Sequence, residues 1–265
     1  MRKYLEVFRL SFKMQIVWRF DVAMTMVATI TRIVAAWILW QAIFAGKEQV
    51  GGFGLEAMLS YYVVCSIVSS IDFSRHISGE ASWLIREGRF SGHMVAPMNP
   101  LGFFSSMVAG QSAFHLGFSL VAAGLCAAAF GMHITLAADI TRIVLAIAMI
   151  PLGLAFMAGY QFFVGTLTFK FVDIDFFLHV QESIIAFATG AMIPLALLPQ
   201  TALSVLQFLP FAHVVYTPSM LLTGQMSARE GLFGLAVIAA WTAAMLLVAQ
   251  RTYGRLRVKY DGVGI

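Results

Sequence analysis

The sequence predicts an all-α membrane protein that crosses the bilayer six times, and three observations lead to this class. Hydrophobic residues make up 60% of the 265 residues and charged residues only 11%, a balance that a water-soluble protein could not keep without a largely apolar surface. Stretches of about 20 mostly apolar residues, long enough to cross the hydrocarbon as a helix, recur along the chain. Lysine and arginine gather in alternate connections between these stretches.

Residues 1–21 predict an amphipathic helix that lies in the membrane interface before the first span. Its charged residues recur at spacings of four, three and four, so they share one stripe of a helix, while apolar side chains occupy the adjoining face. The alternative is a basic tail that simply follows the charge rule. The stripe is Arg2, Glu6, Arg9 and Lys13, and the apolar face is Tyr4, Leu5, Phe8, Phe12 and Ile16.

Residues 22–265 are predicted to form one membrane domain without internal repeats. Each predicted span is an apolar stretch of the length that a membrane-crossing helix requires. The spans are Val22–Ala45, Leu55–Ile71, Phe103–Phe130, Ile143–Phe163, Phe176–Leu198 and Gly231–Ala249.

The positive charges predict which side each connection faces. Six spans place both termini on one side, and that side holds thirteen lysines and arginines against three on the other. Since cytoplasmic loops retain positive charge, we expect cytoplasmic termini and a cytoplasmic Ser74–Asn99 connection, hereafter the insert. Topology and contact with anionic lipid then explain the net charge of +4 without any nucleic acid partner.

Residues 193–225, hereafter the proline segment, form the connection before the last span. This connection is too apolar for an ordinary water-exposed loop, and four prolines break it into short pieces. Such pieces either dip back into the membrane, where they could form a gate on the external side, or rest as a hydrophobic loop on the headgroups. The candidate gate residues are Pro194, Leu197, Pro199, Pro210, Phe211, Tyr216 and Pro218.

Motifs for catalysis, metal binding and nucleotide binding are absent from the sequence. The six histidines and two cysteines have no metal-ligand spacing, no G-x-S-x-G occurs, and Gly46-Lys47 lacks the rest of a phosphate-binding loop. We therefore expect no catalytic residues, no metal and no cofactor on this chain.

The order of these features resembles the permease subunits of type-2 ABC exporters, the ABC-2 family. The matching features are an N-terminal interfacial helix, six spans, a polar insert between spans two and three, and a punctuated segment before the last span. The residues that carry the resemblance are Pro194-Leu195-Ala196-Leu197-Leu198-Pro199, Leu209-Pro210-Phe211, Tyr216-Thr217-Pro218 and Gly224, with Gly88-Arg89-Phe90 and Pro97-Met98-Asn99-Pro100 in the insert.

The resemblance implies that the insert is a coupling helix, which seats in a groove of a separate cytoplasmic ATPase that holds ATP and Mg²⁺. One face would pack on the membrane domain through Trp83, Leu84, Ile85 and Phe90. The other face would pair with the ATPase, and its arginines should tolerate lysine poorly where they make forked contacts. A solvated loop is the alternative. The candidate coupling residues are Glu80, Trp83, Arg86, Glu87, Gly88, Arg89 and Phe90.

The resemblance also implies a second permease, identical or related, and a substrate route at the seam between the two, lined by the first, second and fifth spans. Arg32 is the one charged residue well inside a span, so it faces protein, water or a substrate headgroup. A structural hydrogen bond to a carbonyl explains Arg32 equally well. We expect a multi-pass protein of the bacterial cytoplasmic membrane that exports an amphiphile such as a lipid, glycolipid, drug or peptide.

Two other classes remain as alternatives. An ion-coupled secondary transporter would place ionisable residues at mid-membrane, but the acidic residues fall near predicted span ends. A lipid-modifying enzyme would need a convergent nucleophile, base or metal site, which the sequence does not offer. The acidic residues at span ends are Glu56, Asp72, Asp139, Asp173, Asp175 and Glu182.

Overall fold

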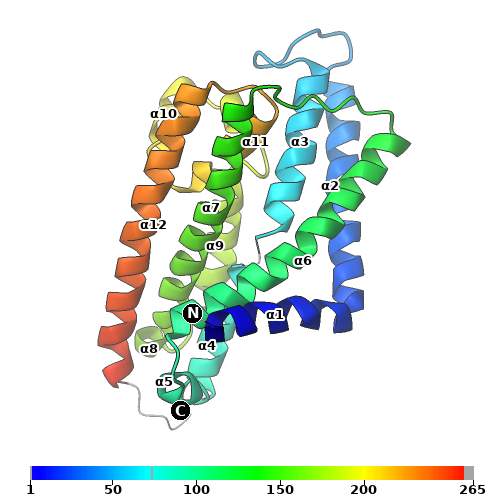
Figure 1. Ribbon diagram of the computed structural model, residues 1–265. Helices are drawn as coiled ribbons and strands as arrows, with labels where there is room; N and C mark the ends of the chain where they lie inside the picture. Colours follow the sequence, from blue (N-terminus) through cyan, green and yellow to red (C-terminus); the bar gives the residue numbers. More distant parts are fainter. Residues whose placement is uncertain (1, 73, 260–265) are drawn as a thin grey trace.

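The computed structural model describes residues 2–72 and 74–259, and within these ranges the chain is helical and contains no strand (Figure 1). The long helices stand beside one another, while α1 lies across one end of the bundle. The elements are α1 (Arg2–Val17), α2 (Arg19–Ile43), α3 (Leu55–Ser70), α4 (Arg75–Arg86), α5 (Ser91–Val95), α6 (Pro100–Ala129), α7 (Ile140–Thr166), α8 (Thr168–Phe171), α9 (Asp175–Ala188), η1 (Leu195–Leu197), α10 (Gln200–Leu206), η2 (Phe211–His213), α11 (Tyr216–Leu222), α12 (Ala228–Leu256) and η3 (Arg257–Lys259).

Five helical runs in the described residues are long and apolar enough to cross a membrane. A sixth would be α10 with η2 and α11, two pieces bent by 82° at the break between them. The predicted starts of spans one to four and six lie within three residues of the observed helix starts. The five runs are Arg19–Ile43, Leu55–Arg86, Pro100–Ala129, Ile140–Phe171 and Ala228–Leu256.

The predicted fifth span, Phe176–Leu198, is wrong as a continuous helix. The helix α9 has only 14 residues, about 21 Å at 1.5 Å per residue, which is shorter than the hydrocarbon core of about 30 Å. It ends at Ala188 because Gly190 takes a left-handed φ of +77° and the chain turns toward Pro194, which begins η1. The apolar composition of residues 189–198 misled the prediction.

The helix α1 packs along α6 rather than lying free of the bundle. Gly110 allows the close approach, because a Cβ there would lie 3.1 Å from Cβ of Ser11. Gln15 contacts His115 of α6 at 3.1 Å. The charged stripe is exposed as predicted, whereas three of the five residues assigned to the apolar face are exposed and two are half-buried against α6. The exposed residues are Arg2, Glu6, Arg9, Lys13, Leu5, Phe12 and Ile16, and the half-buried ones are Tyr4 and Phe8.

The main core surrounds α3, the most deeply buried of the long helices. It is formed by α3, α7, α11 and the inner faces of α2 and α12, and its largest fully buried side chains include Tyr61, Phe156 and Met157. A second cluster, at the end of the bundle that holds the insert, joins α4 to α6, α7 and α12. The insert is therefore part of the packed structure.

Candidate functional site

The insert begins with α4, an amphipathic helix whose apolar face packs on α7. Ile77 and Ala81 are fully buried on this face, and Leu84 and Ile85 extend it. Gly165 of α7 permits the contact, because a Cβ at that position would lie 2.9 Å from Cβ of Ala81. The predicted packing of Leu84 and Ile85 is confirmed.

A glycine turn ends α4 and directs the chain into the second cluster. Gly88 has a φ of +70°, and the backbone N–H groups of Arg89 and Phe90 both donate to the carbonyl of Leu84 at 2.9 Å. The Phe90 ring is thereby placed in contact with the rings of Phe169 and Tyr253. Phe90 is fully buried, as predicted, and ties the insert to α8 and α12.

Arg86 does not face outward, which differs from the expectation that it pairs with an ATPase. Its guanidinium makes a two-pronged contact with Asp175 at the start of α9, with N–O distances of 2.9 and 3.2 Å. Asp173 lies 3.7 Å away and accepts a hydrogen bond from the backbone N–H of Asp175. Residues three and four apart share one face of a helix, so Arg86 follows both the exposed Trp83 and the buried Ser82 and lies at the edge of the packed face of α4. The ion pair joins the insert directly to α9.

The free face of the insert carries a small charged and aromatic surface. Trp83 was expected to pack on the membrane domain, but its side chain is 44% exposed. The guanidinium of Arg89 lies over the indole of Trp83, 5.1 Å from the ring centroid, and holds it on the outer face. Glu80 and Glu87 are exposed on the same helix and the turn that follows it.

The proline segment folds into short helices, as the four prolines predicted. Pro194, Pro199 and Pro210 each precede a short helix, whereas Pro218 lies in the first turn of α11, where a missing N–H costs nothing. Residues 212–221 are buried within the protein. Of the candidate gate residues, Pro194, Pro210, Tyr216 and Pro218 are buried, Leu197 and Phe211 are half-buried, and Pro199 is exposed.

Two tyrosines of α3 fix the break that follows α9. The Tyr61 hydroxyl donates to the carbonyl of Gly190 at 2.9 Å, and the Tyr62 hydroxyl donates to the carbonyl of Met192 at 3.1 Å. The backbone N–H of Tyr216 donates to the carbonyl of Thr189 at 3.0 Å. These bonds satisfy carbonyl groups that the end of a helix leaves open, so the broken backbone is shielded by protein.

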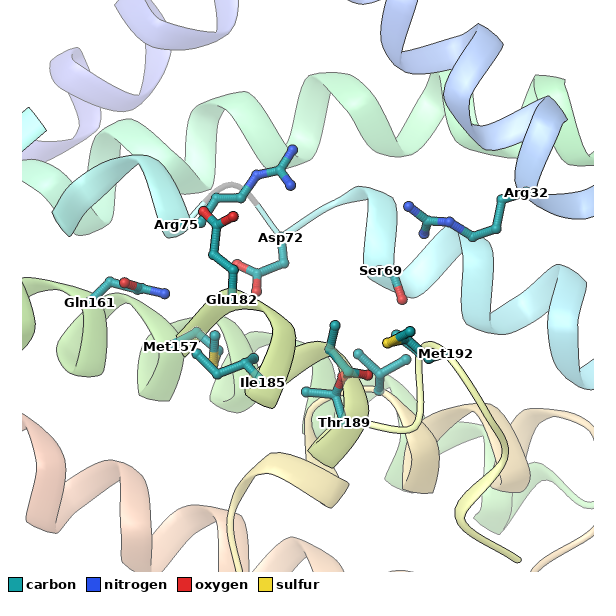
Figure 2. A pocket seen from close by; sticks show the side chains of 13 residues that line it. Arg32, Ser69, Asp72, Arg75, Met157, Gln161, Glu182, Ile185, Thr189 and Met192 are labelled. Atoms are coloured by element: carbon teal, nitrogen blue, oxygen red, sulfur yellow. Dashed lines mark hydrogen bonds between the residues drawn. The ribbon is translucent and has the colours of Figure 1, made fainter. Parts of the chain in front are cut away.

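A pocket of about 250 Å³, lined by four charged side chains and an apolar wall, lies between α2, α3, α7, α9 and the start of α4 (Figure 2). Arg32 reaches into it from α2, and its role in a substrate pathway stays a prediction. Arg32 makes neither a hydrogen bond nor an ion pair with any residue in the described ranges, so the structural bond to a carbonyl that was the alternative explanation is not found there. Glu182 and Asp72 line the same pocket.

Sequence reasoning missed the partners that the fold brings together. Asp72 lies just after the end of α3 as expected, whereas Glu182 lies in the middle of the short helix α9, and their place in one pocket with Arg32 depends on how α3 and α9 pack. Asp175 meets Arg86 across 89 residues of chain, and no local pattern signals such a contact. The buried bond between the side chains of Gln161 and Gln181, at 3.2 Å, was a possible signal, because amides inside apolar spans require partners.

A sequence profile described as "ABC-2 family transporter protein" matches residues 30–264. The match covers most of the chain, and the chain therefore belongs to the ABC-2 transporter family. A search of curated proteins gave no match. Members of this family are membrane transport components without an ATPase of their own, so the chain is a multi-pass membrane permease component of an ABC transporter. The described residues contain no group of three or more metal-binding side chains.

Proposed function

We propose that the chain is the membrane subunit of an ATP-driven exporter that moves an amphiphilic substrate across the bacterial cytoplasmic membrane. The substrate would be a lipid, glycolipid, drug or peptide, and a separate ATPase would hold ATP and Mg²⁺. The two-faced structure of α4 carries the proposal. One face is fixed to α7 by close packing, and the other presents Trp83 and Arg89 to a partner.

The ATPase would bind the exposed surface formed by Glu80, Trp83, Glu87 and Arg89. Exposed aromatic and arginine side chains are the residues that most often anchor protein interfaces. A push on this surface would be transmitted through the fixed face of α4 and through the ion pair between Arg86 and Asp175 to α9. Since α9 supplies Glu182 and Thr189 to the pocket, closure of the ATPase would move one wall of the pocket.

Two permeases and two ATPases would form the working assembly, with the permeases identical or related. The pocket is bounded by α2, α3 and α9, and a second permease placed against these helices would enclose it. The proline segment would close the route on the external side. Surrounding lipids would contact α1, whose exposed charged stripe suits an interface with anionic headgroups.

Two inferences from the sequence support the orientation of the chain in the membrane and the direction of transport. The distribution of lysine and arginine supports cytoplasmic termini and a cytoplasmic insert. Export follows from the likeness to type-2 exporters. An ATPase that binds at Trp83 must be cytosolic, so docking at the insert and the charge distribution support one another.

The test is co-expression and reconstitution with candidate ABC ATPases from the same organism. The wild-type pair should co-purify, and the complex should hydrolyse ATP. Replacing Trp83→Ala together with Arg89→Glu should lower the amount of bound ATPase at least tenfold while leaving membrane insertion unchanged. Arg229→Gln, an exposed arginine at the start of α12, is the matched control and should bind normally. Transport that follows a proton gradient without ATP would instead support an ion-coupled transporter and would overturn the proposal.

A further inference from the structure

The pocket between α2, α3, α7 and α9 contains equal numbers of opposite charges. Arg32 and Arg75 contribute two positive charges, and Asp72 and Glu182 contribute two negative charges. None of these four side chains forms an ion pair with another within the described parts of the chain. Arg32 lies inside a predicted span, where a charge is costly unless a partner or water satisfies it, and Glu182 has neither a hydrogen bond nor an ion pair with a described residue, so the pocket suits a ligand that supplies partners.

The opposite charges are separated across the pocket. Figure 2 shows the Arg32 side chain extending from α2 toward Ser69 on one side, with Asp72 and Glu182 on the other. Asp72 accepts a hydrogen bond from the backbone N–H of Ser74 at 3.0 Å, whereas Glu182 makes no hydrogen bond to a described residue. The pocket therefore has a positive end at Arg32 and a negative end at Glu182.

Arg75 does not cancel the negative end. Asp72 interacts electrostatically with Arg75 and His76, and Glu182 interacts with His76, so the formal charge of two carboxylates against one arginine at this end is negative. Arg32 carries one positive charge at the opposite end. A ligand with a single charge would be attracted by one end of the pocket and repelled by the other. A ligand with one positive and one negative group could pair with both ends at once.

The remaining wall is apolar and adaptable. Met157, Ile185, Met192 and Val215 line it, and methionine side chains adjust to ligands of irregular shape. A volume of about 250 Å³ is smaller than the roughly 300–1,000 Å³ of pockets that enclose a drug-sized molecule. The pocket thus fits the polar head of an amphiphile, and Met192, which is 59% exposed, marks the side where an apolar tail would leave.

We infer that this pocket binds a zwitterionic head group, with its anionic group against Arg32 and Ser69 and its cationic group between Asp72 and Glu182. The inference rests on the proposed function, because it names the chemical class of substrate for the same route. The same chemistry occurs in the head of a membrane amphiphile and in a free zwitterion, and the experiment separates these two sources.

Binding to the purified chain in maltoside micelles tests the inference with three probes that share one tail. Dodecylphosphocholine carries both charges, dodecyl phosphate only the negative charge and dodecyltrimethylammonium only the positive charge. The zwitterion should bind at least tenfold more tightly than either singly charged probe. Tail-free phosphocholine forms the fourth arm. Weak binding of this compound would assign the site to an amphiphile, and equal binding would assign it to a free zwitterion.

Variants at the two ends give opposite changes in preference. Arg32→Gln should remove the advantage of the zwitterion over the cation, and Glu182→Gln should remove its advantage over the anion. Asp72→Asn provides a second test of the negative end should Glu182→Gln fail to fold. Glu48→Gln, an exposed glutamate outside the pocket, is the matched control and should keep the wild-type order.

Equal binding of the three tailed probes, or variants that keep the wild-type order, would overturn the inference. The measurement uses no ATPase, so it is independent of the docking experiment. A preparation that binds and activates its ATPase but does not prefer the zwitterion would refute the pocket assignment alone. A preparation that prefers the zwitterion but binds no ATPase would refute the proposed function alone.

Discussion

The insert and the proline segment lie at opposite ends of the bundle and are fixed by different means (Figure 1). The insert is held by side chains that contact other side chains, through the ring of Phe90 and the ion pair of Arg86 with Asp175. The break that leads into the proline segment is held by side chains that contact backbone, through the hydroxyls of Tyr61 and Tyr62. The insert is therefore held in place by pairs of side chains, and the break before the proline segment by hydrogen bonds from side chains to the backbone.

This difference suits different tasks. Side-chain pairs at the insert fix α4 to α9 while leaving Trp83 and Arg89 exposed, so a partner can bind one face of a helix that is firmly seated on the other. Backbone bonds at the proline segment hold a broken chain inside the bundle, where an open carbonyl would be costly. We expect substitutions at the insert to weaken the transmission of ATPase movement to the pocket. Substitutions of Tyr61 or Tyr62 should instead make the backbone after α9 more mobile.

The largest effect should come from Phe90→Ala, which removes the central side chain of the insert. Phe90 is fully buried among aromatic rings, and truncation of such a residue typically lowers the free energy of unfolding by about 3–5 kcal/mol. Thermal unfolding of the purified chain measures the loss. Val95→Ala is the control, since Val95 lies in the same insert and is 85% exposed. Equal stability of the two variants would mean that the insert is not anchored through this ring.

A smaller loss should follow Tyr61→Phe, which removes one hydroxyl and leaves the carbonyl of Gly190 without its main donor. An unsatisfied buried group costs about 1–3 kcal/mol of unfolding free energy. Hydrogen exchange at residues 189–192 should rise together with this loss. Tyr160→Phe is the matched control, because the Tyr160 hydroxyl makes no hydrogen bond to a described residue. Unchanged exchange would show that the break holds without the hydroxyl.

Arg86→Ala should change stability still less but should affect transmission. The ion pair is partly exposed, with 31% of the Arg86 side chain and 49% of the Asp175 side chain accessible, and such pairs contribute about 0.2–1 kcal/mol. Under the proposed function, the complex should still bind and hydrolyse ATP while transport per ATP falls severalfold. Arg86→Lys should recover only part of the transport, because lysine cannot reproduce the two-pronged contact. Full transport by Arg86→Ala would remove the ion pair from the transmission path.

The sequence contains the information for most of this fold because hydrophobic length alone specifies a membrane span. Five of the predicted spans agree with observed helices, and the insert lies between the second and third of them, as predicted. The early end of α9 could have been read from Gly190 and Pro194, a left-handed position followed by a helix breaker. The apolar residues around Gly190 and Pro194 concealed this helix end, because an apolar composition indicates burial but does not show whether the helix continues.

The contacts that define the candidate sites are less accessible to sequence reasoning. Arg86 was expected to face a partner because it lies on the polar face of the insert, but its guanidinium forms an ion pair with Asp175 of α9. Trp83 was expected to pack because tryptophan is apolar, but the side chain of Arg89 holds it outside. The first outcome depends on a residue 89 positions away, which a single sequence does not record, and the second on a glycine turn that brings Arg89 back over the end of α4.

The smallest predicted effect concerns pH and the packing of His93 in the insert. Burial against the rings of Phe90, Phe103 and Phe104 lowers the pKa of His93. The unfolded chain, in which histidine titrates near its ordinary value of about 6.5, therefore binds more protons than the folded chain between the two pKa values. The folded insert is fully stable above that ordinary value and loses stability as the pH falls below it. Melting temperatures measured from pH 7.5 to 5.5 should fall less for His93→Gln than for the wild type. His179→Gln, a substitution of an exposed histidine, is the control and should follow the wild-type curve. Identical curves for all three proteins would show that His93 is protonated to the same extent in the folded and unfolded chains.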